Sequence, residues 1–261
     1  MGENTNGSSN NLNSLFVATV CNGDVDHQYH LSTLELASQC YQKGVANHNC
    51  IVASSILTQG RNICVSNFLN DRRFDNFLFV DSDIRFDAPT AFTLLNSPYD
   101  IALVPYPVKQ HFWEKSQKGC KNHPQSSGKL LGNKYTIKAV NGASLIDDAW
   151  LEVQHGTTGF MMVRRHVFET IIKKKPNLRI KKNIFTPNGM MEYMNLYNFF
   201  DFKFNPKSGL YSGEDFTFCK LARSCGFKVH AYTKDWIAHC GRHEFTGRYY
   251  DEFIHDFSEP A

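Results

Sequence analysis

The sequence lacks the segments that attach a chain to a membrane. No apolar run approaches the length that spans a bilayer, and the N-terminus carries no hydrophobic signal segment. Position 6 is Asn6 rather than Ser or Thr, so the Met1-Gly2 start does not complete the N-myristoylation pattern. We therefore expect a cytoplasmic chain without a transmembrane segment.

The cysteines show none of the spacings that hold a zinc ion. Eight are present, but none forms a CxxC pair and none has a Cys/His spacing typical of zinc. Several, such as Cys50, Cys64 and Cys219, lie within apparent strands or helices, where buried reduced thiols are common. This distribution is typical of a reducing compartment.

The chain also lacks a strong excess of either charge. Its 28 Lys and Arg against 25 Asp and Glu give a formal charge of +3, which is too small to indicate a nucleic-acid partner. With 261 residues, of which 42% are hydrophobic, the chain can form one large domain or two small ones with a substantial core. No internal repeat is visible.

The first part of the chain alternates between strand and helix patterns. Residues 1–13 are almost entirely polar and predict a disordered tail, followed by one α/β domain over 14–261. Strand-like apolar runs and helical patterns then alternate in the order 15–20, 29–43, 50–56, 59–69 and 77–80. This alternation predicts a mainly parallel central sheet flanked by helices, whose ligands bind at the carboxyl ends of the strands.

The third predicted strand runs directly into two carboxylates, in the segment FLFVDSDIRF at 77–86. Side chains at i and i+2 of an extended chain point the same way, so Asp81 and Asp83 can converge on one point. Paired carboxylates at a strand end can hold a divalent cation against a phosphate ligand. The alternative is a turn in which each Asp bonds only to the backbone.

The later part of the chain is less regular. We expect a helix at 89–95, a strand at 100–104 and a long loop at 110–133, where little periodicity is visible. Strand patterns follow at 135–140, 150–154, 160–163 and 229–232, and helical patterns at 165–172 and 216–224.

Two further features carry potential chemistry. The acidic pair Glu214-Asp215 precedes the helix at 216–224, and His239 follows the last strand. Ser212-x-x-Asp215 resembles a capping box, but a cap uses only one of the two acids, which leaves the other available as a general base. His239 can complete the ligands of a cation bound by the two aspartates, or it can be a structural histidine.

In this order, the motifs resemble the nucleotide-sugar-dependent glycosyltransferases of the GT-A fold, over about residues 14–248. The matching segments are ATVCNG, QGRN, FLFVDSDIRF, YPVK, GTTGFMMVRR, SGEDFTFCKLARSCG and HCGRHEFTG. The chain is similar to small enzymes of bacteria and large algal viruses, and a viral chain would act in the host cytoplasm. The resemblance implies a Rossmann-like domain with a nucleotide-sugar-binding half at 14–109 and an acceptor and catalytic half at 134–250.

The resemblance also implies a role for each motif. It places the donor against Thr19, Asn22, Arg61, Asn62, Asp81, Ser82, Asp83, Lys109, Arg242 and Arg248. It places the acceptor against Gly156, Thr157, Thr158 and Gly159, with Trp113 or Trp150 stacking on a sugar. Mn²⁺ or Mg²⁺ would be bound directly by Asp83 and by His239. Asp81 would bind either the ribose or, through water, the metal. Asp215 would be the general base of an inverting transfer, and Glu214 would orient the acceptor.

The implied donor is a UDP-sugar and the implied acceptor a glycan hydroxyl. UDP-xylose, UDP-galactose and GDP-linked sugars all stay open, as does retention of configuration. The chain departs from the family in two places: the segment 110–133 matches no family motif, and the GED motif lacks the aromatic-glycine lead-in of some relatives.

Two other functions fit part of the pattern. Haloacid-dehalogenase-type phosphatases also carry DxD after a hydrophobic strand, and Asp81 would then be the nucleophile. In that class the motif follows the first strand, whereas two predicted strands precede it here. A module that binds nucleotide sugars or glycans without catalysis would not need Asp83, Asp215 and His239 together.

Overall fold

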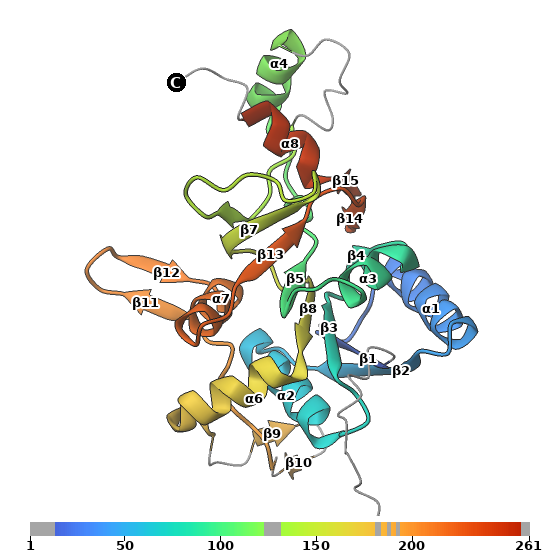
Figure 1. Ribbon diagram of the computed structural model, residues 1–261, viewed down its shortest axis with the longest axis vertical. Helices are drawn as coiled ribbons and strands as arrows, with labels where there is room; N and C mark the ends of the chain where they lie inside the picture. Colours follow the sequence, from blue (N-terminus) through green and yellow to red (C-terminus); the bar gives the residue numbers. More distant parts are fainter. Residues whose placement is uncertain (1–13, 123–131, 181–183, 187–188, 192–193, 257–261) are drawn as a thin grey trace, which may run out of the picture.

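Eight hydrogen-bonded strands form the central sheet, in the order β2-β1-β3-β8-β5-β13-β7-β6 (Figure 1). The computed structural model describes residues 14–122, 132–180, 184–186, 189–191 and 194–256, so the predicted tail at 1–13 lies outside the described residues. The strands of this sheet are β1 Ser14–Cys21, β2 Ala46–Ala53, β3 Asn76–Val80, β5 Ile101–Leu103, β6 Lys138–Ala139, β7 Trp150–His155, β8 Phe160–Arg164 and β13 Val229–Tyr232.

The sheet is mainly parallel, as predicted. Strands β2, β1, β3, β5, β13 and β6 run in one direction, and β8 and β7 run in the other. Strand β8 lies between β3 and β5 and is antiparallel to both. Strands of both predicted halves, 14–109 and 134–250, therefore belong to one sheet.

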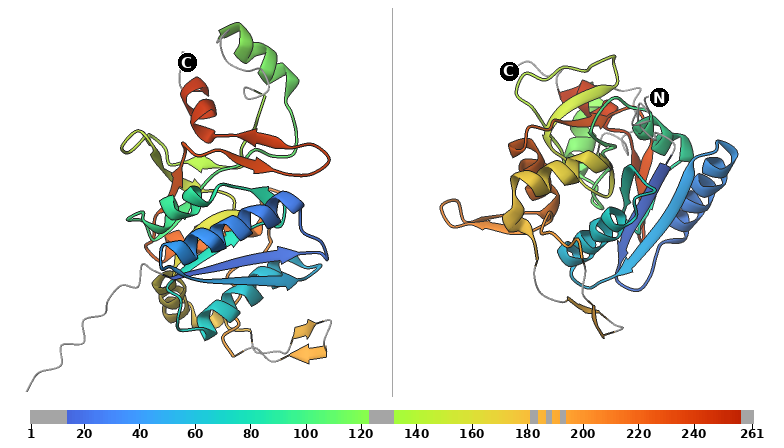
Figure 2. Two further views of the ribbon diagram at one scale, coloured as in Figure 1. Left: turned by 90° about the vertical axis from the view of Figure 1, so that its right-hand side faces the viewer. Right: turned by 60° about the horizontal axis from the view of Figure 1, so that its bottom comes forward.

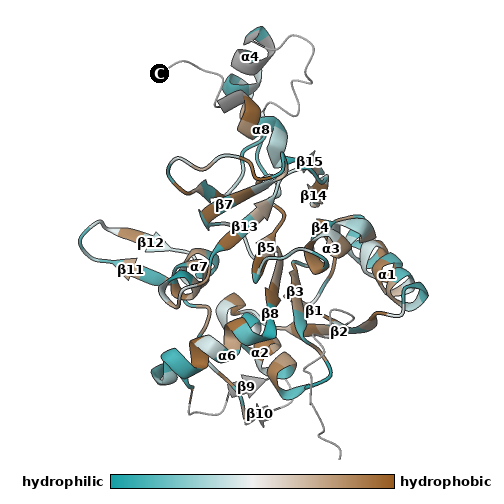
Figure 3. Cartoon of the chain, viewed as in Figure 1, coloured by the Kyte–Doolittle hydropathy of each residue, from teal (hydrophilic) through white to brown (hydrophobic). Residues whose placement is uncertain are grey.

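Helices cover both faces of the sheet (Figure 2). One face packs against α1 His27–Gln42 and α3 Ala88–Leu95, and the other against α2 Leu57–Asn70, α6 Arg165–Lys174 and α7 Glu214–Ser224. Alternate residues of β3 supply the two cores: Phe77 and Phe79 face α2, while Leu78 and Val80 face α1. Because β3 is buried on both faces, its residues 77–80 form a continuous apolar run. Figure 3 shows hydrophobic residues along β3, β5 and β8.

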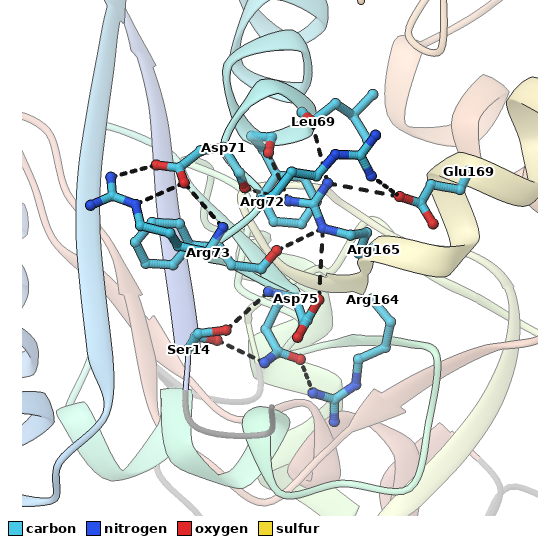
Figure 4. Close-up of polar contacts among 12 residues, drawn as sticks. Ser14, Leu69, Asp71, Arg72, Arg73, Asp75, Arg164, Arg165 and Glu169 are labelled. Atoms are coloured by element: carbon cyan, nitrogen blue, oxygen red, sulfur yellow. Dashed lines mark hydrogen bonds and ion pairs between the residues drawn. The ribbon is translucent and has the colours of Figure 1, made fainter. Parts of the chain in front are cut away.

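Arg165 holds the end of α2 against the start of α6 (Figure 4). Its buried guanidinium donates hydrogen bonds to the carbonyl oxygens of Phe68 (2.8 Å), Asp71 (2.7 Å) and Phe74 (2.7 Å). The last carbonyls of a helix lack the regular partners of those in its interior, and Arg165 supplies donors to them; Phe68 O also accepts from Asp71 N–H at 3.1 Å. This junction fixes α2, which carries Arg61, relative to β8.

A smaller sheet lies beside the end of β3. It consists of β15 Phe245–Gly247, β14 Ile237–His239 and β4 Ile84–Arg85, with β14 in the middle (Figure 1). Because β4 follows the DxD segment and pairs with β14, His239 lies opposite Ile84 and close to Asp83. The other described elements are η1 Pro176–Leu178, β9 Ile184–Thr186, β10 Gly189–Met191, β11 Lys203–Asn205, β12 Leu210–Ser212 and α8 Tyr249–Asp256.

The structure corrects three of the predicted elements. The segment 110–133, predicted as a loop, contains α4 Trp113–Asn122, and residues 123–131 lie outside the described residues. Only Lys138–Ala139 of the predicted strand at 135–140 forms a strand. Strand β2 begins earlier than predicted because it is an edge strand with a largely exposed, polar first half. Among the described residues, no helix has the length and hydropathy needed to cross a bilayer.

Candidate active site

The DxD segment is a tight turn between β3 and β4. Ile84 N–H donates to Asp81 O at 3.1 Å, which closes the turn. Three further backbone hydrogen bonds tie it to distant segments: Asp81 N–H to Gly159 O (2.9 Å), Asp26 N–H to Ser82 O (2.8 Å) and Cys240 N–H to Asp83 O (2.7 Å). These hydrogen bonds fix the backbone of the turn, and therefore the positions from which the two carboxylate side chains extend. Both side chains are half-buried.

Asp81 belongs to a buried network centred on Arg61. Arg61 Nη2 donates to Asp81 Oδ1 at 2.9 Å, and Arg61 Nε donates to Glu214 Oε1 at 3.3 Å. Tyr106 Oη donates to Asp81 Oδ2 at 3.3 Å. The Arg61 side chain is only 3% exposed; burial alone would lower its pKa, but the charges of Asp81 and Glu214 raise it. Arg61 therefore stays charged and links the DxD motif to α7.

Asp83 faces a different set of groups. Its Oδ2 accepts a hydrogen bond from Lys109 Nζ at 2.5 Å and lies 3.4 Å from His239 Nε2. Burial would raise the pKa of Asp83, but His239 and Lys109 together hold it below its usual value. The two aspartates of the motif therefore point to different partners, Asp81 to Arg61 and Asp83 to a lysine and a histidine.

His239 is oriented as metal-binding histidines usually are. Its Nδ1 lies 3.1 Å from the carbonyl oxygen of Pro107, which can only accept, so Nδ1 carries the proton and Nε2 faces Asp83. A hydrogen bond from the distal ring nitrogen to a carbonyl is the usual way to orient an imidazole toward a metal. Carboxylate oxygen and imidazole nitrogen suit Mn²⁺, and the carboxylate suits Mg²⁺. The pair Asp83 and His239 thus fits a divalent cation whose other ligands come from phosphate and water.

The structure does not bring Asp81 into this pair. Both of its carboxylate oxygens are engaged, one by Arg61 and one by Tyr106. Among the described residues, no three His, Cys, Asp or Glu side chains gather as a metal site. Of the three predicted ligands, only Asp83 and His239 face each other.

Glu214 and Asp215 form the first turn of α7. The N-cap residue is Gly213 and makes no side-chain capping bond, so the capping box at Ser212 is not formed. Asp215 Oδ1 accepts a hydrogen bond from Phe216 N–H at 2.8 Å. Burial first, and then the charge of Glu214, raise the pKa of Asp215 to about 6. A carboxylate with this pKa is a suitable general base near neutral pH.

The GTTG segment, residues 156–159, forms the wall beside Asp81. A Cβ atom on Gly159 would collide with the Tyr106 hydroxyl and with Asp81 Oδ2, so only glycine fits there. The hydroxyl of Thr158 is buried and has no hydrogen-bond partner among the described residues. The segment thus lies next to the DxD motif, and its contact with the acceptor stays a prediction.

Three predicted donor residues have other contacts, and a fourth is exposed. Buried Thr19 donates to Val80 O at 2.8 Å and so supports the strand end. All four hydrogen-bonding positions of the Asn62 amide are used by residues 198–200. Arg248 pairs with Asp251 at 2.9 Å, and Asn22 is exposed at the end of β1. Thr19 and Asn62 therefore act on the fold rather than presenting free polar groups.

Arg242 and the predicted stacking tryptophans lie in different surroundings. Arg242 is exposed three residues after the end of β14. Trp113 is 71% exposed at the start of α4 and contacts His111. Trp150 packs between Tyr99 (4.8 Å) and Tyr232 (4.9 Å), where its ring supports the sheet.

Tyr106 is a residue of the site that the sequence patterns did not indicate. It lies in Pro105-Tyr106-Pro107, directly after β5, and its buried hydroxyl contacts Asp81. Burial, and then the charge of Asp81, raise its pKa well above the usual value, so it remains a hydrogen-bond donor. A tyrosine between prolines at a strand end was the available signal.

These features define an α/β protein with a polar site at the carboxyl ends of β3 and β5, completed by α7 and β14. No protein-family model and no curated protein sequence matches the chain. Solved structures with similarity to the chain include the following two. A197 from STIV has a TM-score of 0.46 and 15% identity and is aligned over 87% of this chain and 85% of its own. A glycosyltransferase involved in the glycosylation of the major capsid of PBCV-1 has a TM-score of 0.33 and 13% identity. It is aligned over 64% of this chain and 67% of its own. At these values neither likeness assigns a function, so the residues of the site carry the argument below.

Proposed function

We propose that the protein is a metal-dependent glycosyltransferase of the GT-A type, which transfers a sugar from a UDP-linked donor to a glycan hydroxyl with inversion. One observation carries the proposal: buried Arg61 joins the DxD motif to the acidic pair of α7, beside a carboxylate whose pKa is raised to about 6. A site for a diphosphate and a general base are thereby held next to each other by one side chain.

The cationic groups around Asp83 suit the leaving diphosphate. Lys109 already contacts Asp83, and exposed Arg242 follows β14. Asp83 and His239 would hold the divalent cation, which supplies positive charge at the departing phosphate. Asp81, bound by Arg61 and Tyr106, would contact the ribose rather than the cation.

The acceptor hydroxyl is activated on the other side of Arg61. Asp215 takes the proton of the hydroxyl, the hydroxyl oxygen forms a bond to the anomeric carbon, and the bond from that carbon to the diphosphate oxygen breaks. The electron pair leaves with the diphosphate. Glu214 is held by Arg61 and positions the acceptor, while Gly159 leaves room for the Tyr106 hydroxyl to pack beside Asp81.

The phosphatase alternative is not favoured by the geometry. A nucleophilic aspartate must present a free oxygen to phosphorus. Both oxygens of Asp81 are instead bound, at 2.9 Å by Arg61 and at 3.3 Å by Tyr106.

The proposal is tested by exchanging Asp215. Asp215→Asn keeps the acceptor of the Phe216 N–H bond but cannot take a proton. We expect wild-type protein with Mn²⁺ to consume a UDP-sugar, with a rate that falls about tenfold per pH unit below pH 6. Asp215→Asn should bind the same donor with unchanged affinity and lose turnover. Retained turnover in this variant, or no binding of any nucleotide sugar to the wild type, contradicts the proposal.

A further inference from the structure

A pocket of about 540 Å³ lies between α7, β7 and the end of β12. Its lining includes Asn141, Gln154, His155, Phe216, Lys220 and Arg223. None of the described residues that line it is acidic. Ser212 and Phe216, which both border the pocket, flank Glu214-Asp215 in the sequence. The pocket therefore borders the first turn of α7, which carries the general base proposed above. In Figure 1, α7, β7 and β12 lie on the same side of the molecule.

Two cations on one face of α7 point to an anionic ligand. Phe216, Lys220 and Arg223 follow one another at i, i+4 and i+7, while Phe218 and Cys219 on another face are buried in the core. Lys220 is exposed and makes no ion pair within the described part of the chain. It is therefore free to contact a ligand.

The neighbouring charges leave the pocket positive. Arg223 Nη1 lies 3.6 Å from Glu152 Oε1, and Lys228 Nζ lies 2.7 Å from the other oxygen of the same carboxylate. One carboxylate thus faces two cations. Lys138, paired with His155 across β6 and β7, adds a further positive charge. The electrostatic potential of this surface therefore attracts anions.

The remaining lining suits a sugar. The imidazole of His155 lies 3.8 Å from the Phe216 ring, which gives the pocket an aromatic wall. The Asn141 and Gln154 amides provide donors and acceptors for hydroxyl groups. Burial first, and then the charges of Lys138 and Arg223, lower the pKa of His155, so its ring is neutral at pH 7 and responds to a bound anion.

We propose that this pocket is the acceptor subsite and that the acceptor carries an anionic group, a sugar carboxylate or a sugar phosphate, bound by Lys220 and Arg223. Its role as an acceptor subsite rests on the glycosyl transfer proposed above. Its selectivity for an anionic sugar is independent of that function and can be measured without a nucleotide.

The test measures the binding of three probes by NMR titration: methyl glucuronide, glucose 6-phosphate and neutral methyl glucoside. We expect at least one acidic probe to bind about tenfold more tightly than the neutral one, and this difference to shrink at high salt. Binding of that probe should raise the pKa of the His155 imidazole, which locates it in the pocket. The tighter of the two acidic probes identifies the carboxylate or the phosphate as the preferred group.

Two matched lysine variants complete the test. Lys220→Gln should weaken the acidic probe about tenfold, whereas Lys173→Gln, which changes an exposed lysine at the end of α6 outside the pocket, should not. Equal binding of all three probes, or unchanged affinity in Lys220→Gln, overturns the inference. Binding of UDP is measured separately: its absence would contradict glycosyl transfer but would leave the result for the pocket intact.

Discussion

Arg61 links the two acidic motifs of the site. Asp81 and Glu214 are far apart in the sequence, yet the guanidinium lies 2.9 Å from one carboxylate and 3.3 Å from the other. A planar guanidinium presents donors in several directions at once, which a lysine does not. Glu214 is neutralised by Arg61, whereas Asp215 forms no ion pair of its own within the described ranges, so the two neighbouring acids have different environments.

The charged form of Asp215, which the proposed reaction needs, should lower the stability of the fold. Its pKa rises from 3.8 in the unfolded chain to about 6 in the folded one, so the folded state prefers the protonated form. The resulting destabilisation is absent below pH 3.8, grows as the pH rises to about 6 and is complete above it. A shift of this size corresponds to up to about 3 kcal/mol.

We therefore expect Asp215→Asn to stabilise the protein at pH 8 by up to about 3 kcal/mol and to have little effect near pH 3.8. Urea unfolding of both proteins at the two pH values measures the difference. An equal change in the free energy of unfolding at both pH values would show that the charge of Asp215 is not the cause.

Some residues of the site could be predicted from the sequence, and their positions explain why. Asp81 and Asp83 follow a fully apolar strand, and such strands end at the ligand-binding edge of a parallel sheet. The resemblance placed His239 with Asp83, but the contact of Asp81 with Arg61 could not be predicted, because Arg61 comes from α2 and meets Asp81 only in the folded chain. Asn62 gave the same local signal as Arg61, but its amide is used by the Asn198 side chain and the backbone of Phe199 and Phe200.

At the level of elements, the reversed strand β8 shapes the site. It enters the sheet between β3 and β5 from the opposite direction, so its first residues lie beside the last residues of β3. Gly159 O accepts the hydrogen bond from Asp81 N–H as a result. The apolar run 160–163 predicted a buried strand but not its direction, because burial on both faces is the same for either direction. Helix α4 was missed because its sequence is strongly polar and has few apolar residues to mark a helical pattern.

The junction of β3 and β8 should not tolerate a side chain at position 159. In Gly159→Ala, the new methyl group meets the Tyr106 hydroxyl and the Asp81 carboxylate, both held by hydrogen bonds. We expect a loss of about 1–3 kcal/mol in the free energy of unfolding, together with weaker binding of UDP, measured by denaturation and calorimetry.

Gly44→Ala is the control for this variant. Gly44 has a φ of +66°, and no atom lies within 4 Å of the place that a Cβ atom would take, so alanine there costs about 1 kcal/mol through backbone strain alone. Its UDP affinity should equal that of the wild type. If both variants bind UDP equally well, the contact between β8 and Asp81 has no part in the donor site.

At the scale of the whole molecule, the site draws on segments from α2 to β14, which the packing of the central sheet, its helices and the small sheet brings together. Asp83 and His239 are the two described side chains proposed to hold the cation, which would then gain most of its remaining ligands from a bound diphosphate. We therefore expect Mn²⁺ alone to bind weakly and to raise the thermal unfolding temperature little, because stabilisation follows the ratio of ligand concentration to Kd.

Mn²⁺ and UDP should strengthen each other's binding. We expect Mn²⁺ to lower the Kd of UDP at least about tenfold and, by thermodynamic linkage, UDP to lower the Kd of Mn²⁺ by the same factor. Calorimetric titrations in both orders measure the two factors.

Asp83→Asn should abolish the coupling, since it removes one of the two protein ligands. Asp81→Asn should weaken UDP but keep the coupling factor, because the oxygens of Asp81 are bound by Arg61 and Tyr106. A Kd for UDP that is the same with and without Mn²⁺ would contradict this prediction. Lys109, which lies 2.5 Å from Asp83, would then be the group that neutralises the diphosphate.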